Sequence, residues 1–347
     1  MNKILTTLIT AGILSASFTG FANAADKVTI KFSHVVAENT PKGKMAKRFK
    51  ELLEQRAGDK VEVKIYPNSQ LFGDNKVLEA VLLGDVQIAA PTLSKFSRYT
   101  KKLQVYDLPF LFSNMSSVED FQKGSYGQEL LNSMERRGII GLGYLHNGLK
   151  QMSAYTPIKT PEDVVGKKFR IMSSDVLKEQ FDTLNAIPLK KPFSEVFILL
   201  QTRAIDGVEN PWSNIYSKKF HEVQPYITET NHGLVDYMVV TSKSFLQSLT
   251  PELRGLVKHA MSDALEYGNQ VACEKAVSDR QAIIDSGKSE LISLTKDERQ
   301  KWVSTMKPVW KRFEKDIGED IINAAVNADK NSAPSAGCTE KMAAKEL

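Results

Sequence analysis

The stretch Gly166–Ile171, with the sequence GKKFRI, decides the fold when it is taken together with Glu209–Trp212, ENPW, further along the chain. In the first stretch Phe169 and Ile171 flank Arg170 in a short strand pattern that follows a glycine turn. An arginine leaving a strand end in an α/β protein lies where ligands usually bind, at the carboxyl edge of the sheet. Because its guanidinium stays charged and presents a planar fork of donors, Arg170 suits the bidentate binding of a carboxylate. Taken alone, it could also be a surface residue on an edge strand.

Two regions of the chain alternate between strand and helix patterns. In the first region the expected strands cover residues 28–33, 61–66 and 86–90, and the expected helices cover 41–56 and 75–83. A helix near 117–136 and strands at 139–143 and 151–154 lead to the second region. There the expected strands are 168–171, 187–189 and 206–210, with helices at 175–184 and 193–202. Strands joined by helical crossovers predict parallel sheets covered on both faces, and two such units predict two α/β lobes with a ligand cleft between them.

The C-terminal third is expected to be helical. From Pro251 to about Ser286 there is scarcely a helix breaker. At about 1.5 Å per residue this helix would be roughly 50 Å long, so we expect it to span both lobes, although a break at Gly268 would give two helices. A last amphipathic helix is expected from Lys296 to about Ile322, and its aromatic stripe is typical of a core.

The N-terminus has the pattern of a cleaved signal peptide. Lys3 is followed by the mostly apolar stretch Ile4–Phe18 and by Ala22-Asn23-Ala24, a typical cleavage site. The mature chain is therefore expected outside the cytoplasm. The expected division is a signal peptide at 1–24, a first lobe at 25–147 and 236–275, a second lobe at 148–235 and 276–327, and a tail at 328–347.

The charge distribution and the cysteine content further limit the classes of protein to which this chain could belong. The formal net charge is +5, and the basic residues are spread along the chain without the clustered stripe of a nucleic-acid-binding protein. No other apolar run approaches the length of a membrane span. Cys273 and Cys338 could pair in an oxidising compartment and tie the tail to the long helix, the alternative being two unpaired thiols.

Enzyme and metal motifs are not found in the sequence. The stretch His221–Pro225 begins like a zinc-protease motif, but it lacks the second histidine and its proline would break the helix. There is no G-x-S-x-G elbow and no P-loop, and the histidines show no ligand spacing. We therefore expect no cofactor and no metal.

What the chain offers instead is a set of polar side chains near predicted strand ends. They are His34, Thr92, Ser94, Lys95, Asn147, Lys150, Arg170 and Asn210. Each could also be structural or solvent-exposed; Asn210, for example, could cap a helix that begins at Pro211. Together they would place cations and neutral donors from both lobes around one crevice without an evident general base. Such a set is suited to holding an anion.

Several strings resemble the solute-binding proteins of tripartite ATP-independent periplasmic (TRAP) transporters, and most of all their dicarboxylate-binding type. These strings are residues 32–43, 66–74, 107–112, 192–197, 200–202, 204–211 and 230–232. The resemblance runs from about Val28 to Ile322, nearly the whole mature chain. It implies a two-lobed fold like that of periplasmic binding proteins, which closes on its ligand by a hinge motion. It also implies a periplasmic protein that delivers its ligand to a two-component membrane permease. A monomer is expected, although the sequence does not fix the oligomeric state.

The resemblance also implies roles for individual residues. Arg170 would pair with one carboxylate, with supporting contacts from Asn210, Lys150, Phe193, His34 and the turn of Thr92, Ser94 and Lys95. Trp212 and Asn147 are further candidates from their places in the sequence. The second carboxylate would need another cation, supplied by Lys42, Lys95, Lys150 or His34. Position 150 is lysine where relatives that bind sugar acids have arginine, so a point charge replaces a fork there. The residues do not rank malate, succinate and fumarate.

Two other functions compete with this hypothesis. A secreted enzyme acting on a carboxylate would need a positioned acid or base, for which Glu38, Glu209 and His34 are the candidates. A ligand-sensing partner of a membrane receptor would share the cleft and differ only in what it contacts afterwards.

Overall fold

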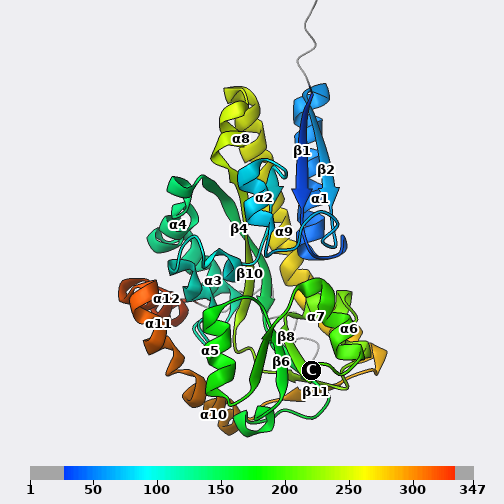
Figure 1. The fold of residues 1–347 in the computed structure, drawn as a ribbon, viewed down its shortest axis with the longest axis vertical. Coiled ribbons are helices and arrows are strands. Elements are labelled where there is room, and N and C mark those ends of the chain that lie inside the picture. Colours follow the sequence, from blue (N-terminus) through cyan, green and yellow to red (C-terminus); the bar gives the residue numbers. More distant parts are fainter. Residues whose placement is uncertain (1–26, 333–347) are drawn as a thin grey trace, which may run out of the picture.

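The structure, a computed structural model, describes residues 27–332 and has two α/β lobes (Figure 1). The sheet of the first lobe has the order β2-β1-β3-β10-β4. Its strands are β1 (Val28–Ser33), β2 (Val61–Tyr66), β3 (Ile88–Ala89), β4 (Ile139–Leu149) and β10 (Leu234–Ser242). The sheet of the second lobe has the order β11-β9-β5-β8-β6-β7. Its strands are β5 (Gln151–Ala154), β6 (Lys168–Ile171), β7 (Ile187–Lys190), β8 (Gly207–Asn210), β9 (Tyr226–Glu229) and β11 (Glu290–Ser293).

The two-lobed α/β prediction is confirmed, but the sheets are mixed rather than purely parallel. In the first sheet β10 runs antiparallel to β3 and β4, and in the second β5 runs antiparallel to β8 and β9. Both reversed strands arrive directly from the other lobe, β5 from β4 and β10 from β9. Strands β4 and β9 end at the cleft, where the chain crosses to the other lobe. Strands β5 and β10 therefore begin at the cleft and run away from it, in the direction opposite to their neighbours. The helical crossovers predicted from sequence therefore describe the other strands only.

Helices cover both sheets. Those before the C-terminal third are α1 (Pro41–Ala57), α2 (Val77–Leu83), α3 (Met115–Lys123), α4 (Ser125–Asn132), α5 (Asp175–Thr183), α6 (Val196–Gln201), α7 (Trp212–Ser217) and α8 (Lys243–Ser248). Helix α1 starts where the sequence places it because Thr40 caps it, accepting a hydrogen bond from the Gly43 N–H at 3.2 Å, with Pro41 in its first turn. Its apolar face, including Met45 and Phe49, is fully buried.

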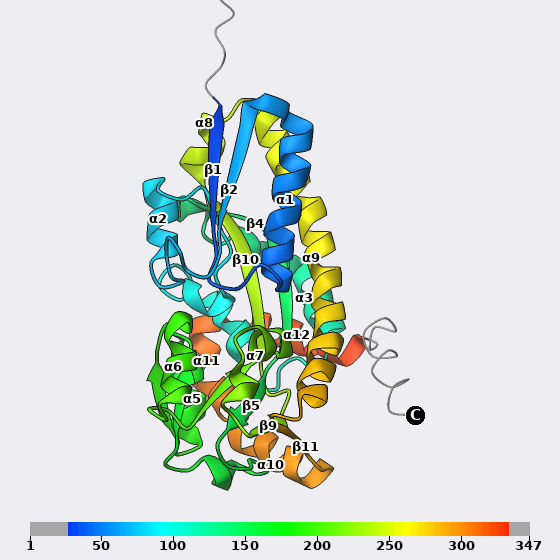
Figure 2. The ribbon, with the colours of Figure 1, turned by 90° about the vertical axis from the view of Figure 1, so that its right-hand side faces the viewer.

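Helix α9 (Pro251–Ser286) is one unbroken helix that spans both lobes, as predicted. It packs against α1 in the first lobe and α7 in the second (Figure 2). Gly268 does not break it. A Cβ atom at this position would lie 2.7 Å from Leu145 Cδ1 and 2.8 Å from Met45 Cβ. The glycine is therefore explained by close packing against β4 and α1.

The prediction of a single last helix is wrong. The segment forms α10 (Lys296–Met306), α11 (Val309–Ile317) and α12 (Glu319–Asn331). The breaks fall at Pro308, which ends the preceding helix, and at Gly318, whose φ of 106° is outside the helical range. Helix α10 contacts the second lobe, where Trp302 Nε1 donates to the Lys159 carbonyl at 2.9 Å. Buried residues of α11 and α12 pack in one cluster with residues of α2, α3 and β10 of the first lobe.

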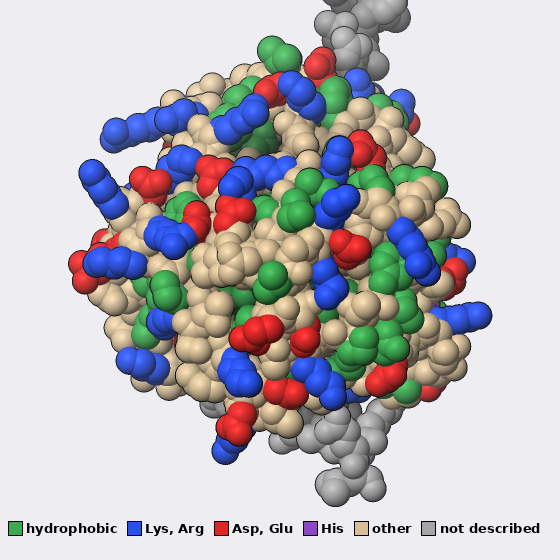
Figure 3. All heavy atoms as spheres, turned by 60° about the horizontal axis from the view of Figure 1, so that its bottom comes forward, with side chains coloured by type: hydrophobic (Ala, Val, Ile, Leu, Met, Phe, Trp, Pro, Cys, Tyr) green, Lys and Arg blue, Asp and Glu red, His purple; other side chains and the backbone are tan. Residues whose placement is uncertain are grey.

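Some predictions are not tested by the structure of residues 27–332. The proposed limits between the lobes stay a prediction. The signal peptide and Cys338 lie outside the described residues, so cleavage and the pairing of Cys273 with Cys338 also stay predictions. Within residues 27–332 no helix is long and apolar enough to cross a membrane. On the face shown in Figure 3, basic and acidic side chains are intermixed.

Candidate functional site

A cavity of about 470 Å³ lies between the lobes, at the carboxyl ends of strands from both sheets. From the first lobe it is lined by Val35, Val36, Ser69, Gly73, Asp74, Asn75, Lys76, Thr92, Lys95, Val235 and Tyr237. From the second lobe it is lined by Met172, Pro192, Ser194, Asn214 and the predicted residues Arg170, Phe193 and Asn210. Most of these residues lie in or just after β1, β2, β3, β6, β7 and β8, which is where an α/β fold collects its ligand contacts.

Arg170 is held in place by its own lobe. It lies in β6 between β7 and β8, and only 3% of its surface is exposed. Its Nε donates a hydrogen bond to the Lys191 carbonyl at 3.0 Å, and its Cζ lies 5.7 Å from the centre of the Phe193 ring. The two Nη groups make no hydrogen bond within the described residues. Burial lowers the Arg170 pKa to about 10, against the opposing charges of Glu209 and Asp74, so the group stays charged at neutral pH.

Neutral donors beside Arg170 lack partners. Asn210, at the end of β8, accepts a hydrogen bond from Asn214 Nδ2 at 3.0 Å, while its own Nδ2 is buried without a partner. The Thr92 hydroxyl is buried and unpartnered in the same way. A buried polar group without a partner costs about 1–3 kcal/mol, and such groups in native proteins usually meet a ligand or water. Both side chains face the cavity, so a ligand there could satisfy them.

Two lysines of the first lobe at the cavity make no ion pair within the described residues, whereas the third, Lys76, pairs with Glu79 at 3.1 Å. Lys95 lines the cavity, and its Nζ donates to Asn75 Oδ1 at 2.9 Å. Lys42 is 1% exposed, makes no hydrogen bond through Nζ, and lies 3.5 Å from the centre of the Tyr237 ring. Tyr237 lines the cavity, so Lys42 reaches the site from behind this ring. Burial lowers the pKa of Lys42 and that of Lys95 to about 8, opposed by the negative charge of Asp74.

His34 lies near these groups but is not in the cavity lining. Both of its ring nitrogens are buried without a partner. Burial and the nearby Lys42 charge lower the His34 pKa to about 3. The ring is therefore neutral at physiological pH and can offer one N–H donor, but not the positive charge that was considered for it from sequence.

Lys150 is placed in an ion pair instead of in the cavity lining. Its Nζ lies 2.8 Å from Glu209 Oε1, and the other Glu209 oxygen lies 2.8 Å from His232 Nε2. All three side chains are buried. Burial would raise the Glu209 pKa, but Lys150 and His232 lower it to about 2. The lysine charge is thus neutralised inside the protein, and we do not assign Lys150 to the ligand.

Three other predicted residues support the cavity from outside its lining. Asn147 Nδ2 donates to the Tyr237 hydroxyl at 2.8 Å and thereby orients the ring over Lys42. Ser94 Oγ donates to Asp107 Oδ1 at 2.6 Å, and Asp107 Oδ2 accepts a hydrogen bond from Ser174 of the second lobe at 2.7 Å. Trp212 is buried, with the Arg280 guanidinium 5.9 Å from its ring.

Several residues that line the cavity were not among the candidates predicted from the sequence. Ser69, Asp74 and Asn75 belong to the loop after β2, so the strand-end rule used for the other candidates would have found them. Tyr237 lies inside β10 and carries no local signal. It reaches the cavity because β10 pairs with β3, where Val240 is opposite Ala89.

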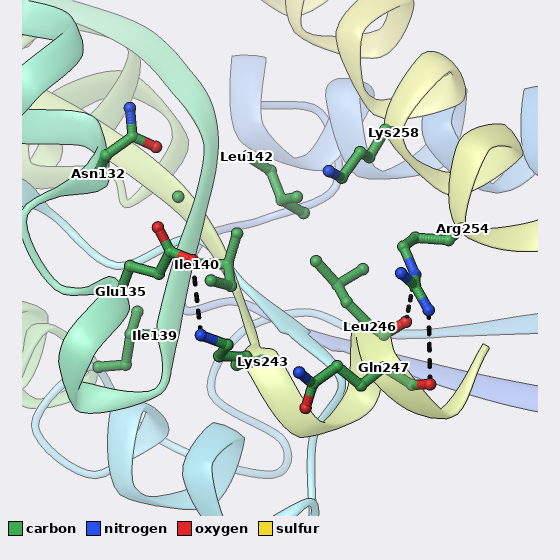
Figure 4. Close-up of a pocket in the computed structure, with 11 residues that line it drawn as sticks. Asn132, Glu135, Ile139, Ile140, Leu142, Lys243, Leu246, Gln247, Arg254 and Lys258 are labelled. Atoms are coloured by element: carbon green, nitrogen blue, oxygen red, sulfur yellow. Dashed lines mark hydrogen bonds and ion pairs between the residues drawn. The ribbon is translucent and has the colours of Figure 1, made fainter. Parts of the chain in front are cut away.

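A second cavity, of about 430 Å³, lies at the far end of the first lobe (Figure 4). Its charged groups are largely satisfied by the protein itself. Lys243 lies 3.6 Å from Glu135, and Arg254 donates to the carbonyls of Leu246 and Leu249 at 2.7 and 3.1 Å. The unpartnered donors therefore single out the interlobe cavity as the candidate site.

The catalytic candidates are not arranged for acid–base chemistry. Glu38 is exposed, Glu209 is ionised within its pair with Lys150, and His34 has no partner to orient it. Within residues 27–332 no group of histidine, cysteine and carboxylate side chains could hold a metal ion.

Residues 32–316 match the model of the bacterial extracellular solute-binding proteins, family 7. The chain belongs to this family. It is 59% identical over 320 residues to the C4-dicarboxylate-binding periplasmic protein DctP of Shewanella loihica, which covers 92% of this chain and 94% of that protein. It is 45% identical over 327 residues to the protein of the same name from Vibrio cholerae, covering 93% of this chain and 98% of that protein.

Solved structures of family members agree with the fold. A TRAP periplasmic solute-binding protein from Shewanella oneidensis with bound succinate superposes with a TM-score of 0.87 at 61% identity, covering 87% of this chain and 99% of that one. A second, from Pseudomonas aeruginosa with bound L-malate, has a TM-score of 0.80 at 44% identity and covers 82% and 99%. The resemblance to TRAP solute-binding proteins of the dicarboxylate-binding type is thereby confirmed. The chain is a solute-binding protein, so the alternative of a secreted enzyme is wrong.

Proposed function

We propose that this family member binds a four-carbon dicarboxylate of the succinate and malate class in the periplasm and delivers it to a TRAP membrane permease. The observation that carries the proposal is the charge of the interlobe site. Arg170, Lys95 and Lys42 bring three positive charges to it, and Asp74 brings one negative charge. Lys150 and Glu209 neutralise each other, and so do Lys76, which also lines the cavity, and Glu79 at 3.1 Å. The net charge of two matches a dianion.

In the proposed binding mode each lobe holds one end of the ligand. The free Nη groups of Arg170 and the unpartnered Nδ2 of Asn210 would donate to one carboxylate, with Phe193 packing beside the guanidinium. Lys95 and Thr92 would take the second carboxylate, with the Lys42 charge behind Tyr237 stabilising it. Because the donors lie on different lobes, a ligand that bridges them stabilises the closed arrangement.

The relatives support the class of ligand. The relatives from Shewanella loihica and Vibrio cholerae are named for C4 dicarboxylates, and the solved structures from Shewanella oneidensis and Pseudomonas aeruginosa hold succinate and L-malate. The likeness to TRAP solute-binding proteins supports delivery to a permease, and the relatives named as periplasmic proteins support the periplasmic location. A receptor-linked sensor would share the site, and only the partner would distinguish it.

Isothermal titration calorimetry with succinate, L-malate, fumarate and butyrate tests the proposal. The three dicarboxylates should bind at one per chain, and butyrate, which has a single carboxylate, should bind at least about a hundredfold more weakly because one lobe is left unengaged. Succinate binding no more tightly than butyrate would refute the proposal. Uptake of labelled succinate by vesicles that contain the permease, measured with and without this protein, tests the delivery step.

A further inference from the structure

Asp74 is a carboxylate in a cavity otherwise arranged to receive anions. It lies in the loop after β2, is half-buried, and lines the cavity together with Lys95 and Arg170. Within residues 27–332 it takes part in no hydrogen bond and no ion pair. Its charge is therefore not used to hold the fold together, and it acts on whatever occupies the cavity.

The charge of Asp74 reaches all three cations of the site. Burial lowers the pKa values of Lys42, Lys95 and Arg170, and the negative charge of Asp74 opposes this shift for each of them. These cations come from different elements and from both lobes. Asp74 therefore lies within electrostatic range of all three cations and lines the same cavity.

Size alone does not explain which acids the cavity admits. Its volume of about 470 Å³ falls within the range of roughly 300–1,000 Å³ that is typical of pockets for drug-sized ligands, so a six-carbon tricarboxylate is not excluded by space. Without Asp74 the three cations would match a trianion. With Asp74 present, a third carboxylate on the ligand would be repelled by the Asp74 charge in a partly desolvated site.

We propose that Asp74 is a specificity residue that limits the ligand to two negative charges by repelling a third carboxylate. Discrimination through a built-in repulsion is a common way for a site to reject a close analogue. This inference rests on the proposed function, because it presupposes that dicarboxylates bind between Arg170 and the lysines of the first lobe.

The test is the variant Asp74→Asn, which keeps the shape of the side chain and removes its charge. Calorimetry at neutral pH would compare succinate with tricarballylate (propane-1,2,3-tricarboxylate). The control is Asp85→Asn, which removes one negative charge from an exposed position of the same lobe. The wild-type protein and Asp85→Asn should bind succinate and reject tricarballylate. In Asp74→Asn the ratio of the two dissociation constants should shift toward tricarballylate by at least about tenfold.

Two results would overturn the inference while leaving the proposed function intact. One is an unchanged ratio in a folded Asp74→Asn variant that still binds succinate. The other is a selective loss of malate relative to succinate with no gain for tricarballylate, which would make Asp74 an acceptor for a ligand hydroxyl. If the wild-type protein binds neither acid, the proposed function itself fails.

Discussion

Replacing Arg170 with alanine gives the sharpest test of how the site works. The guanidinium is 3% exposed and fixed by the Lys191 carbonyl, so its Nη donors are already oriented before a ligand arrives. A carboxylate that enters the closed cavity loses its water and depends on this fork. Removing one partner of a buried, hydrogen-bonded charge pair costs about 2–5 kcal/mol, which corresponds to a loss of roughly 30- to 5,000-fold in affinity.

The assay is calorimetry with succinate, supported by the ligand-induced rise in unfolding temperature. Arg170→Ala should lose most of that rise. Arg170→Lys should lie between the two, because it keeps the charge without the fork. Lys168→Ala is the matched control, since it removes a cation from the same strand at an exposed position and should leave binding unchanged.

A folded Arg170→Ala variant that binds succinate with nearly wild-type affinity would contradict the role proposed for Arg170. Such a result would mean that the ligand carboxylate contacts another group, and the charge balance proposed for the cavity would have to be abandoned.

Three further predictions follow from the geometry. Succinate affinity should fall as the pH rises through about 8, because the dianion binds the protonated forms of Lys42 and Lys95, whose pKa values are about 8. Titrations in buffers of different ionisation enthalpy should show proton uptake on binding. Constant affinity up to pH 10 would contradict this prediction. Lys150→Met should lower the free energy of unfolding by about 3–5 kcal/mol in urea titrations, because the buried Glu209 charge loses its lysine partner. A loss of ligand affinity without a loss of stability would instead indicate that Lys150 contacts the ligand. Gly268→Ala should destabilise the protein by about 1–3 kcal/mol because the new Cβ would clash with Leu145 and Met45. Gly255→Ala, at an open position of the same helix, should be neutral or stabilising by up to about 1 kcal/mol. Equal effects of the two changes would disprove the packing explanation.

Most helices and strands, and several residues that line the cavity, could be predicted from the sequence. Period-two strands, apolar helix faces and a breaker-free C-terminal segment are local properties, so the two α/β units and a long C-terminal helix could be predicted from them, while the structure showed that this helix continues through Gly268. Arg170, Asn210, Thr92 and Lys95 could be found because the carboxyl ends of strands in such units meet at one edge, whereas Phe193 was implied by the family resemblance. The family motifs then supplied the class of ligand.

Only the tertiary structure decided which cations remain available to a ligand. Lys150 looked equivalent to Lys95 in the sequence, but Glu209, on a strand of the second lobe, neutralises it. Asp74 and Tyr237 enter the cavity through the arrangement of the loop after β2 and the pairing of β10, which is reversed because it arrives from the other lobe. Charge and hydrogen-bond partners depend on distances between residues far apart in the chain, and no local pattern encodes those distances.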